Sequence, residues 1–158
     1  MRLRLAEPKD CESVIALIDR VLYEYGDAIC LDDADRDLVD IEHHYHRQGG
    51  AFIVLDDDGE IRGTHATLPA KGLPDVCIFR RLYLDQGLRG SKWGESLMDW
   101  AVDWACSNGF GRVEFWSDTR FNRAHSFFRR CGFRTDGRTR EMDDGIAPYR
   151  EYFFYLNL

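Results

Sequence analysis

The segment from Leu84 to Gly94 combines residue types that bind anions. It has the sequence Leu-Asp-Gln-Gly-Leu-Arg-Gly-Ser-Lys-Trp-Gly, and an amphipathic helical pattern begins directly after its glycine-rich turn. The first turn of a helix leaves backbone N–H groups without partners, and the helix dipole adds partial positive charge there. Gly90 allows close approach to the backbone, while Arg89 and Lys92 each add a full charge. The segment therefore predicts a site for a phosphate or pyrophosphate.

The surrounding pattern resembles the GNAT N-acetyltransferase superfamily. A β-prone run, Phe79–Leu84, precedes the anion turn, and the helical segment Asn122–Phe133 follows it and ends in Cys-Gly-Phe. The pyrophosphate-binding pattern of that superfamily is Gln/Arg-x-x-Gly-x-Gly/Ala. Arg89 occupies its first position and Gly94 its sixth, whereas Lys92 replaces the glycine of the fourth. The resemblance extends over most of the chain.

The resemblance implies one α/β domain over residues 1–158, with a mixed, mostly antiparallel sheet of six to seven strands flanked by about four helices. It also implies an acyltransferase that moves an acetyl group from acetyl-CoA to the amine of a small-molecule or amino-acid-like acceptor, directly in a ternary complex. Backbone amides of the turn would hold the pyrophosphate, and the strand before it would bond to the pantetheine arm as an extra strand would. The residues that the resemblance assigns to the cofactor are Leu82, Leu84, Arg89, Gly90, Ser91, Lys92, Trp93, Gly94, Asn122 and Phe128. Asn122 is equally well explained as the N-cap of its helix.

Two positions lack the groups that relatives often use for catalysis. Phe128 stands where many relatives have a tyrosine that protonates the leaving thiolate, and Ile78 where several have a glutamate base. His125, Tyr83 and His65 are weak substitutes, because each is more often a structural residue. The catalytic residues therefore stay open. A non-catalytic acyl-CoA-binding sensor or interaction module is the alternative function.

Composition narrows the class of partner. The net charge of −7 and the pI near 5.2 disfavour nucleic acid and suit a cationic amine, although such charge often serves only solubility. The acidic segment Asp27–Asp40 is expected to be a solvated loop. His43, His44 and His46 lack the i, i+4 spacing of a metal pair, so no metal is expected.

The remaining expectations concern compartment and assembly. Five cysteines without a Cys-x-x-Cys pair favour a reduced compartment, and no apolar run reaches membrane-spanning length, so we expect a cytoplasmic protein without membrane contact. A homodimer is one option for its assembly.

Periodicity predicts alternating helices and strands. It places Leu82 and Leu84 on one face of their strand, with Tyr83 opposite, and Leu38, Ile41 and Tyr45 on one face of a helix. The Asp58-Gly59 pair between two β-prone runs predicts a hairpin. The expected strands are Arg2–Ala6, Ala51–Leu55, Ile61–Leu68, Val76–Leu84, Arg112–Trp116, Phe133–Thr139 and Tyr149–Leu156. The expected helices run from Pro8 to about Tyr25, from about Asp35 to Gln48, from the anion turn to Asn108-Gly109, and from Asn122 to Cys131.

Overall fold

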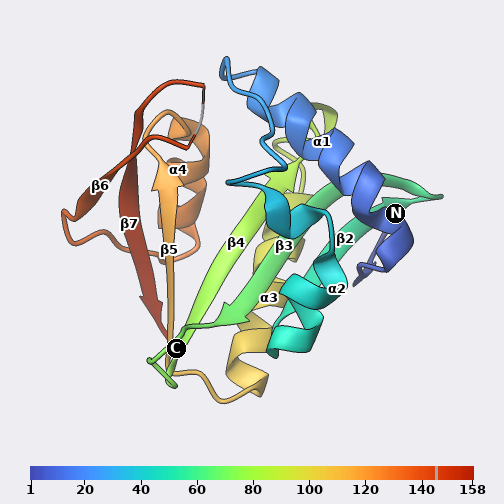
Figure 1. Cartoon of the computed structure of the whole chain (residues 1–158). Helices are drawn as coiled ribbons and strands as arrows, with labels where there is room; N and C mark the ends of the chain where they lie inside the picture. Colours follow the sequence, from blue (N-terminus) through green and yellow to red (C-terminus); the bar gives the residue numbers. More distant parts are fainter. Residues whose placement is uncertain (145) are drawn as a thin grey trace.

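The computed structural model describes residues 1–144 and 146–158 and contains a seven-stranded sheet in the order β1-β2-β3-β4-β5-β7-β6 (Figure 1). Neighbouring strands are antiparallel except β4 and β5, which are parallel. This confirms the predicted mixed, mostly antiparallel α/β fold. The strands are β1 (Arg2–Leu5), β2 (Ala51–Asp57), β3 (Glu60–Pro69), β4 (Val76–Leu84), β5 (Arg112–Asp118), β6 (Thr139–Met142) and β7 (Tyr149–Asn157).

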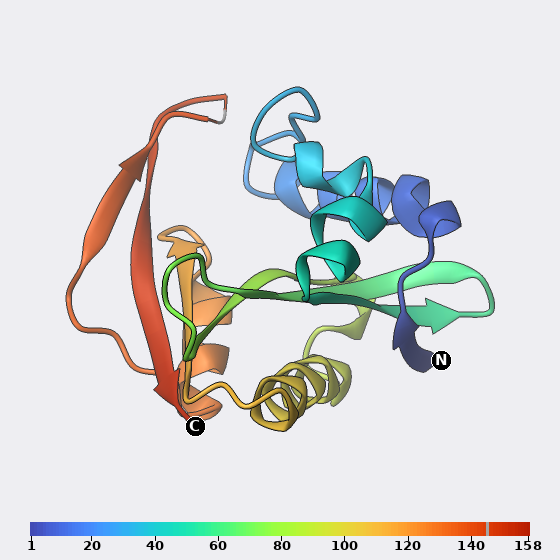
Figure 2. The same ribbon diagram turned by 60° about the horizontal axis from the view of Figure 1, so that its bottom comes forward.

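Helices cover both faces of the sheet (Figure 2). One core lies beneath α1 and α2, and the other is formed by α3 and α4 against β4, β5 and β7. The α-helices are α1 (Cys11–Tyr23), α2 (Ile41–His44), α3 (Trp93–Ser107) and α4 (Asn122–Arg130). Short 3-10 turns occur at Pro8–Asp10 (η1), Arg36–Leu38 (η2), His46–Gln48 (η3) and Gln86–Leu88 (η4).

The two long helices follow the predicted apolar spacing. In α3, Leu97, Met98 and Ala101 are buried, whereas Glu95 and Asp99 are exposed. Each such buried large side chain contributes roughly 1.5–3 kcal/mol relative to an exposed one. The corresponding buried residues of α1 are Val14, Leu17, Ile18 and Val21.

The predicted helix from Asp35 to Gln48 is wrong as one continuous element. The segment instead forms η2, the four-residue α2 and η3. The side chain of Asp40 accepts a hydrogen bond from the His43 N–H and starts α2 afresh, and Tyr45 leaves helical geometry at φ −122° and ψ −65°. The apolar residues expected on one face, Leu38, Ile41 and Tyr45, are nevertheless all buried.

The predicted strand Phe133–Thr139 is also wrong. Only Arg134 forms an isolated bridge to β7, and the ladder with β7 starts at Thr139. Asp136 accepts hydrogen bonds from the backbone and side chain of Arg138, and Gly137 adopts φ +87° between them. This turn breaks the segment before β6 begins.

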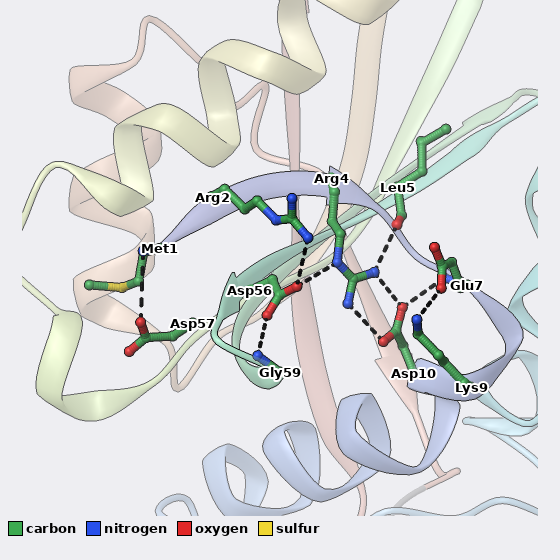
Figure 3. Close-up of polar contacts among 10 residues, drawn as sticks. All are labelled: Met1, Arg2, Arg4, Leu5, Glu7, Lys9, Asp10, Asp56, Asp57 and Gly59. Atoms are coloured by element: carbon green, nitrogen blue, oxygen red, sulfur yellow. Dashed lines mark hydrogen bonds and ion pairs between the residues drawn. The ribbon is translucent and has the colours of Figure 1, made fainter.

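The β2–β3 hairpin is confirmed, and it carries one end of a charged cluster (Figure 3). Arg4 donates to Asp56 at 2.7 Å and to both oxygens of Asp10 at 2.7 and 2.9 Å. The free oxygen of Asp56 accepts from Gly59 N–H, and Asp10 also accepts from Glu7 N–H. Arg4 therefore joins β1, the hairpin and the start of α1 in a cluster whose carboxylate oxygens are all bonded.

Candidate active site

The sheet splits between β4 and β5. The two strands pair only where Val76–Ile78 faces Arg112–Glu114, and they then diverge toward Leu84 and Asp118 (Figure 1). Between Phe79 and Leu84, β4 has no strand partner on its β5 side within the described chain. A groove of about 570 Å³ lies in this split and is lined by residues of both strands.

A β-bulge in β4 decides which side chains face which core. Between the pairs Ala66↔Arg80 and Thr64↔Tyr83, β4 has one residue more than β3, and Arg81 takes the left-handed φ of +57°. After the bulge, Leu82 joins the core of α3 and α4, while Tyr83 joins the core of α1 and α2. Leu84 lies near Gly94 at the start of α3. Leu82 and Leu84 therefore share a face and Tyr83 points the opposite way, as the sequence predicted.

The predicted anion turn lies between β4 and α3. The turn passes through η4, and Gly90 adopts φ +82°, with nothing within 4 Å of where a Cβ would stand. The backbone N–H groups of Gly90, Lys92, Gly94 and Glu95 donate to no other group in the described chain. Free amides at a helix start fit a phosphate, because both the N–H groups and the helix dipole attract negative charge.

The polar side chains of the turn are partly engaged. Arg89 donates through both terminal nitrogens to Glu24 and through Nε to the Leu84 carbonyl oxygen. Ser91 bonds locally to the Leu88 carbonyl oxygen and to Trp93 N–H. Lys92 is exposed and makes no ion pair with any described residue. The guanidinium of Arg89 is thus held by Glu24, the C-cap residue of α1.

Ile78 and Phe128 both line the groove. Phe128 is 6% exposed and packs its ring against Phe115 and Phe154 at centroid distances of 4.8 and 5.3 Å. Neither side chain can transfer a proton, so any acid or base must come from other residues.

The three weak catalytic candidates occupy different environments. His65 is fully buried and donates from Nδ1 to the Leu97 carbonyl oxygen at 3.1 Å, and burial lowers its pKa to about 4. Burial and then Arg129 lower the pKa of His125, whose Nε2 lies 3.1 Å from Ser117 Oγ. Burial raises the pKa of Tyr83. Both imidazoles are therefore neutral near pH 7, and the phenol of Tyr83 keeps its proton.

Asn122 is not the N-cap of α4. It is the first helical residue, Phe121 precedes it as the cap, and its exposed side chain makes no hydrogen bond with the described residues. The capping explanation is therefore wrong, whereas a contact with the cofactor arm stays a prediction.

The solvated acidic loop is wrong for two of its residues. Asp35 and Asp37 are buried and both accept hydrogen bonds from Arg81, and Tyr45 donates to Asp37. Arg81 lowers the pKa of Asp37 against the opposing effect of burial. The bulge aims Arg81 at this loop, and a non-local bond of this kind leaves no periodic pattern in the sequence.

Two carboxylates on the opposite wall of the groove were missed by sequence reasoning. Asp118 in β5 stands directly across from Glu151 in β7, and both are largely buried and line the groove. Burial raises the pKa of Glu151, and the neighbouring Arg140 opposes this effect. A charged residue within the aromatic run Tyr149–Tyr155 was the available sign, because such a run otherwise packs into a core.

The described residues contain neither a metal-binding cluster nor a membrane-spanning helix. No group of three or more histidine, cysteine or acidic side chains is arranged to hold a metal ion among residues 1–144 and 146–158. Over the same residues, no helix has the length and apolar character needed to cross a membrane.

Comparisons with known proteins agree with this geometry. The sequence model of the acetyltransferase (GNAT) family matches residues 16–133. The uncharacterized N-acetyltransferase YjgM of Escherichia coli (strain K12) is 25% identical over 130 residues, covering 79% of this chain and 77% of that protein. The family match covers the anion turn and the two strands, β4 and β5, between which the sheet splits.

Solved structures confirm the fold. A GNAT-family acetyltransferase from Staphylococcus aureus Mu50 superposes with a TM-score of 0.84 at 22% identity, covering 99% of this chain and 98% of that one. The yncA protein of Salmonella typhimurium, a putative acetyltransferase solved with its cofactor acetyl-CoA, gives a TM-score of 0.76 at 16% identity, covering 100% and 94%.

Proposed function

Because the chain belongs to the GNAT acetyltransferase family, we propose that it transfers the acetyl group of acetyl-CoA to the amine of a small acceptor. The transfer is direct, with both substrates bound together in the groove between β4 and β5. The observation that carries this proposal is the split of the sheet beside an anion turn with free backbone N–H groups.

The residues at the turn fit the CoA part of the co-substrate. Gly90, Lys92 and Gly94 offer free amides to the pyrophosphate, with the side chains of Lys92 and Arg89 nearby as full charges. Ser91 and Trp93 belong to the same turn. The unpaired edge of β4 at Leu82 and Leu84 supplies backbone groups for the pantetheine arm, and Asn122 and Phe128 on α4 face that arm from the other wall.

The acetyl thioester supplies an activated carbonyl group, and the protein positions the amine against it. Holding two reactants in attack geometry makes a bimolecular step effectively unimolecular, which accounts for a large part of such catalysis. No protein nucleophile is needed, and the buried thiol of Cys77, whose pKa is raised to about 12 by burial, is not suited to be one.

Isothermal titration with acetyl-CoA tests the binding step. We expect saturable binding, and we expect Lys92→Ala to weaken it about tenfold, because a charge-assisted hydrogen bond contributes roughly 1.5–3 kcal/mol. Lys71→Ala is the matched control, since Lys71 is also an exposed lysine and lies in the loop between β3 and β4. Absence of binding at millimolar acetyl-CoA, or equal effects of the two variants, would contradict this assignment of the turn.

Free-thiol release from acetyl-CoA over a panel of amines tests the chemistry. Turnover above the hydrolysis background supports the enzyme. Tight acetyl-CoA binding with no turnover on any amine would instead support the non-catalytic sensor.

A further inference from the structure

Most carboxylates that line the β5–β7 wall of the groove are already bonded. Both oxygens of Asp118 accept hydrogen bonds from Arg120, which also reaches Asp27 at 3.2 Å. Asp144 accepts from the hydroxyl of Tyr149 at 2.8 Å. The bonding capacity of Asp118 and Asp144 is therefore used by neighbouring protein residues.

Glu151 differs from them. Arg140 donates from Nε to Oε1 at 2.9 Å, its Nη2 lies 2.8 Å from the same oxygen as an ion pair, and Oε2 accepts no hydrogen bond from the described residues. The side chain is 12% exposed and lines the groove. Oε2 is not a sealed atom, since Arg62 Nε is the only fully buried unbonded side-chain atom of the described chain. One carboxylate oxygen is therefore open toward the groove.

The β4 wall offers the opposite charge. The bulge places Arg80 and Arg81 on the same side of β4, where both act electrostatically on Asp37. Arg81 donates three hydrogen bonds to Asp35 and Asp37 and one to the Ala34 carbonyl oxygen, so the two carboxylates neutralise its charge. Arg80 is exposed, lines the groove, and makes no hydrogen bond or ion pair with any residue that the structure describes. The groove thus has an unpaired cation on one wall and an open carboxylate oxygen on the other.

We propose that the acceptor carries an anionic group beside its amine, as an amino acid does, and that Arg80 binds the anionic group while Glu151 binds the amine. This inference rests on the proposed function. A guanidinium forms paired hydrogen bonds with a carboxylate, phosphinate or phosphonate. An ammonium group completes the bonding of Oε2, which a neutral hydroxyl would do with less electrostatic gain.

Glu151 also replaces the base that Ile78 cannot provide. The ammonium group of the acceptor gives one proton to Oε2 and becomes a nucleophilic amine. Its nitrogen forms a bond to the acetyl carbon, the C–S bond breaks, and the electron pair leaves on the CoA sulfur. The nitrogen then loses its second proton to that thiolate, and Glu151 releases the first proton to water. The products are the amide, the free thiol and one proton.

Matched pairs of acceptors test the anion subsite. The probes are the common amino acids and the amines that remain when their carboxyl group is removed, such as phenylalanine with phenethylamine and leucine with isoamylamine. For the wild type we expect kcat/KM to be more than tenfold higher for the better amino acids than for their decarboxylated partners. Arg80→Gln should abolish this preference, mainly through KM, and Arg80→Lys should restore part of it. Arg2→Gln, at an exposed arginine far from the groove, is the control.

The base is tested separately. Glu151→Gln should lower kcat about 100-fold for every acceptor, a typical contribution of general base catalysis. It should also remove the acidic limb of the kcat/KM profile while leaving acetyl-CoA affinity by titration unchanged. Glu141→Gln, at an exposed glutamate of β6, is the control.

The outcomes separate the two levels of the proposal. If kcat/KM is equal for amines with and without the acid group and Arg80→Gln does not change it, the anion subsite is wrong. The proposed acetyltransferase function is not affected by that result. An unaltered pH profile in Glu151→Gln overturns the base. No turnover with any amine, despite acetyl-CoA binding, overturns the proposed function and this inference with it.

Discussion

The Arg4 cluster at the sheet edge and the Glu151 pair in the groove are built from the same residue types but differ in completeness. Around Arg4, every oxygen of Asp10 and Asp56 accepts a hydrogen bond (Figure 3). Around Glu151, Arg140 engages only Oε1, and Oε2 accepts no hydrogen bond from the described residues. Closed clusters of this kind hold elements together, whereas an open one keeps bonding capacity for a ligand. Removing a residue should therefore affect stability at the first cluster and catalysis at the second.

The largest effect is expected for Arg4→Ala. It leaves two largely buried carboxylates without their partner, and breaking such a buried pair costs about 3 kcal/mol or more. The melting temperature should fall by roughly 6–12 °C, at the 2–4 °C per kcal/mol typical of domains of this size.

Arg2→Ala is the control for the Arg4 cluster. Arg2 lies 3.8 Å from the same Asp56, but its side chain is 77% exposed. Such an exposed pair is worth about 0–1 kcal/mol. Equal melting temperatures for the two variants would show that the cluster does not stabilise the fold.

A second prediction concerns the pH profile of catalysis. Arg140→Ala removes the cation that opposes the effect of burial on Glu151, so the pKa of Glu151 should rise further. The acidic limb of kcat/KM should move to higher pH by about one unit or more, since a nearby opposite charge shifts a carboxyl pKa by about 1–3 units. The loss should therefore be largest on that limb, about tenfold or more, and should shrink as pH rises. Arg140→Lys should keep the limb near its wild-type position, and a loss that is equal at all pH values would contradict this role.

The ionised pair of Glu151 and Arg140 should also destabilise the folded protein at neutral pH. Burial raises the folded-state pKa of Glu151, so its contribution is most favourable below the unfolded pKa and is lost as pH rises through the folded pKa. Asp10 has the opposite sign, because Arg4 and Glu7 N–H lower its pKa and its contribution is lost as pH falls. In thermal denaturation, Glu151→Gln should therefore melt above the wild type near pH 7, and the gap should close below about pH 4, near the ordinary glutamate pKa. A gap independent of pH would rule out ionisation as its cause.

The smallest effect is expected at Glu24, whose pair with Arg89 is partly exposed. Glu24→Ala should change stability by less than about 1 kcal/mol. It should also strengthen acetyl-CoA binding about two- to fivefold, because Arg89 is released toward the phosphates while a repelling charge is removed. Glu12→Ala on the same helix is the control, and weaker binding in Glu24→Ala would show that Glu24 instead holds Arg89 in its binding position.

Local patterns predicted most of the fold, and both wrongly predicted elements are interrupted where an aspartate side chain accepts a backbone N–H hydrogen bond. The stripe of α1 and the Asp58-Gly59 hairpin depend on residues close in sequence, and both are confirmed. In the segment Asp35–Gln48, Asp40 accepts the His43 N–H and starts α2, while Arg81, more than 40 residues away, holds Asp35 and Asp37 beside η2. Periodicity of apolar residues does not register such polar side-chain bonds, so the helical spacing persists where the helix is broken.

One part of the candidate site could be predicted from the sequence and another part could not. The anion turn was predicted because its glycines, its charges and the helix start are contiguous in the sequence. The opposed carboxylates Asp118 and Glu151 meet only through the register of β5 with β7, and the pairing of Arg89 with Glu24 only through the docking of α1. Neither the separation of two residues along the chain nor their type predicts such contacts.

The split between β4 and β5 also has a mechanical consequence. The three residue pairs at Val76–Ile78 are the only backbone ladder that joins the β1–β4 block of the sheet to the β5–β7 block among the described residues. Beyond these pairs the edge of β4 is not laddered to β5, and a ligand inserted along that edge spans the gap between the two strands. Bound acetyl-CoA would then serve as a strut between the blocks. Amide hydrogen exchange at Phe79–Leu84 should slow when it binds, while exchange in the already laddered β2 should hardly change.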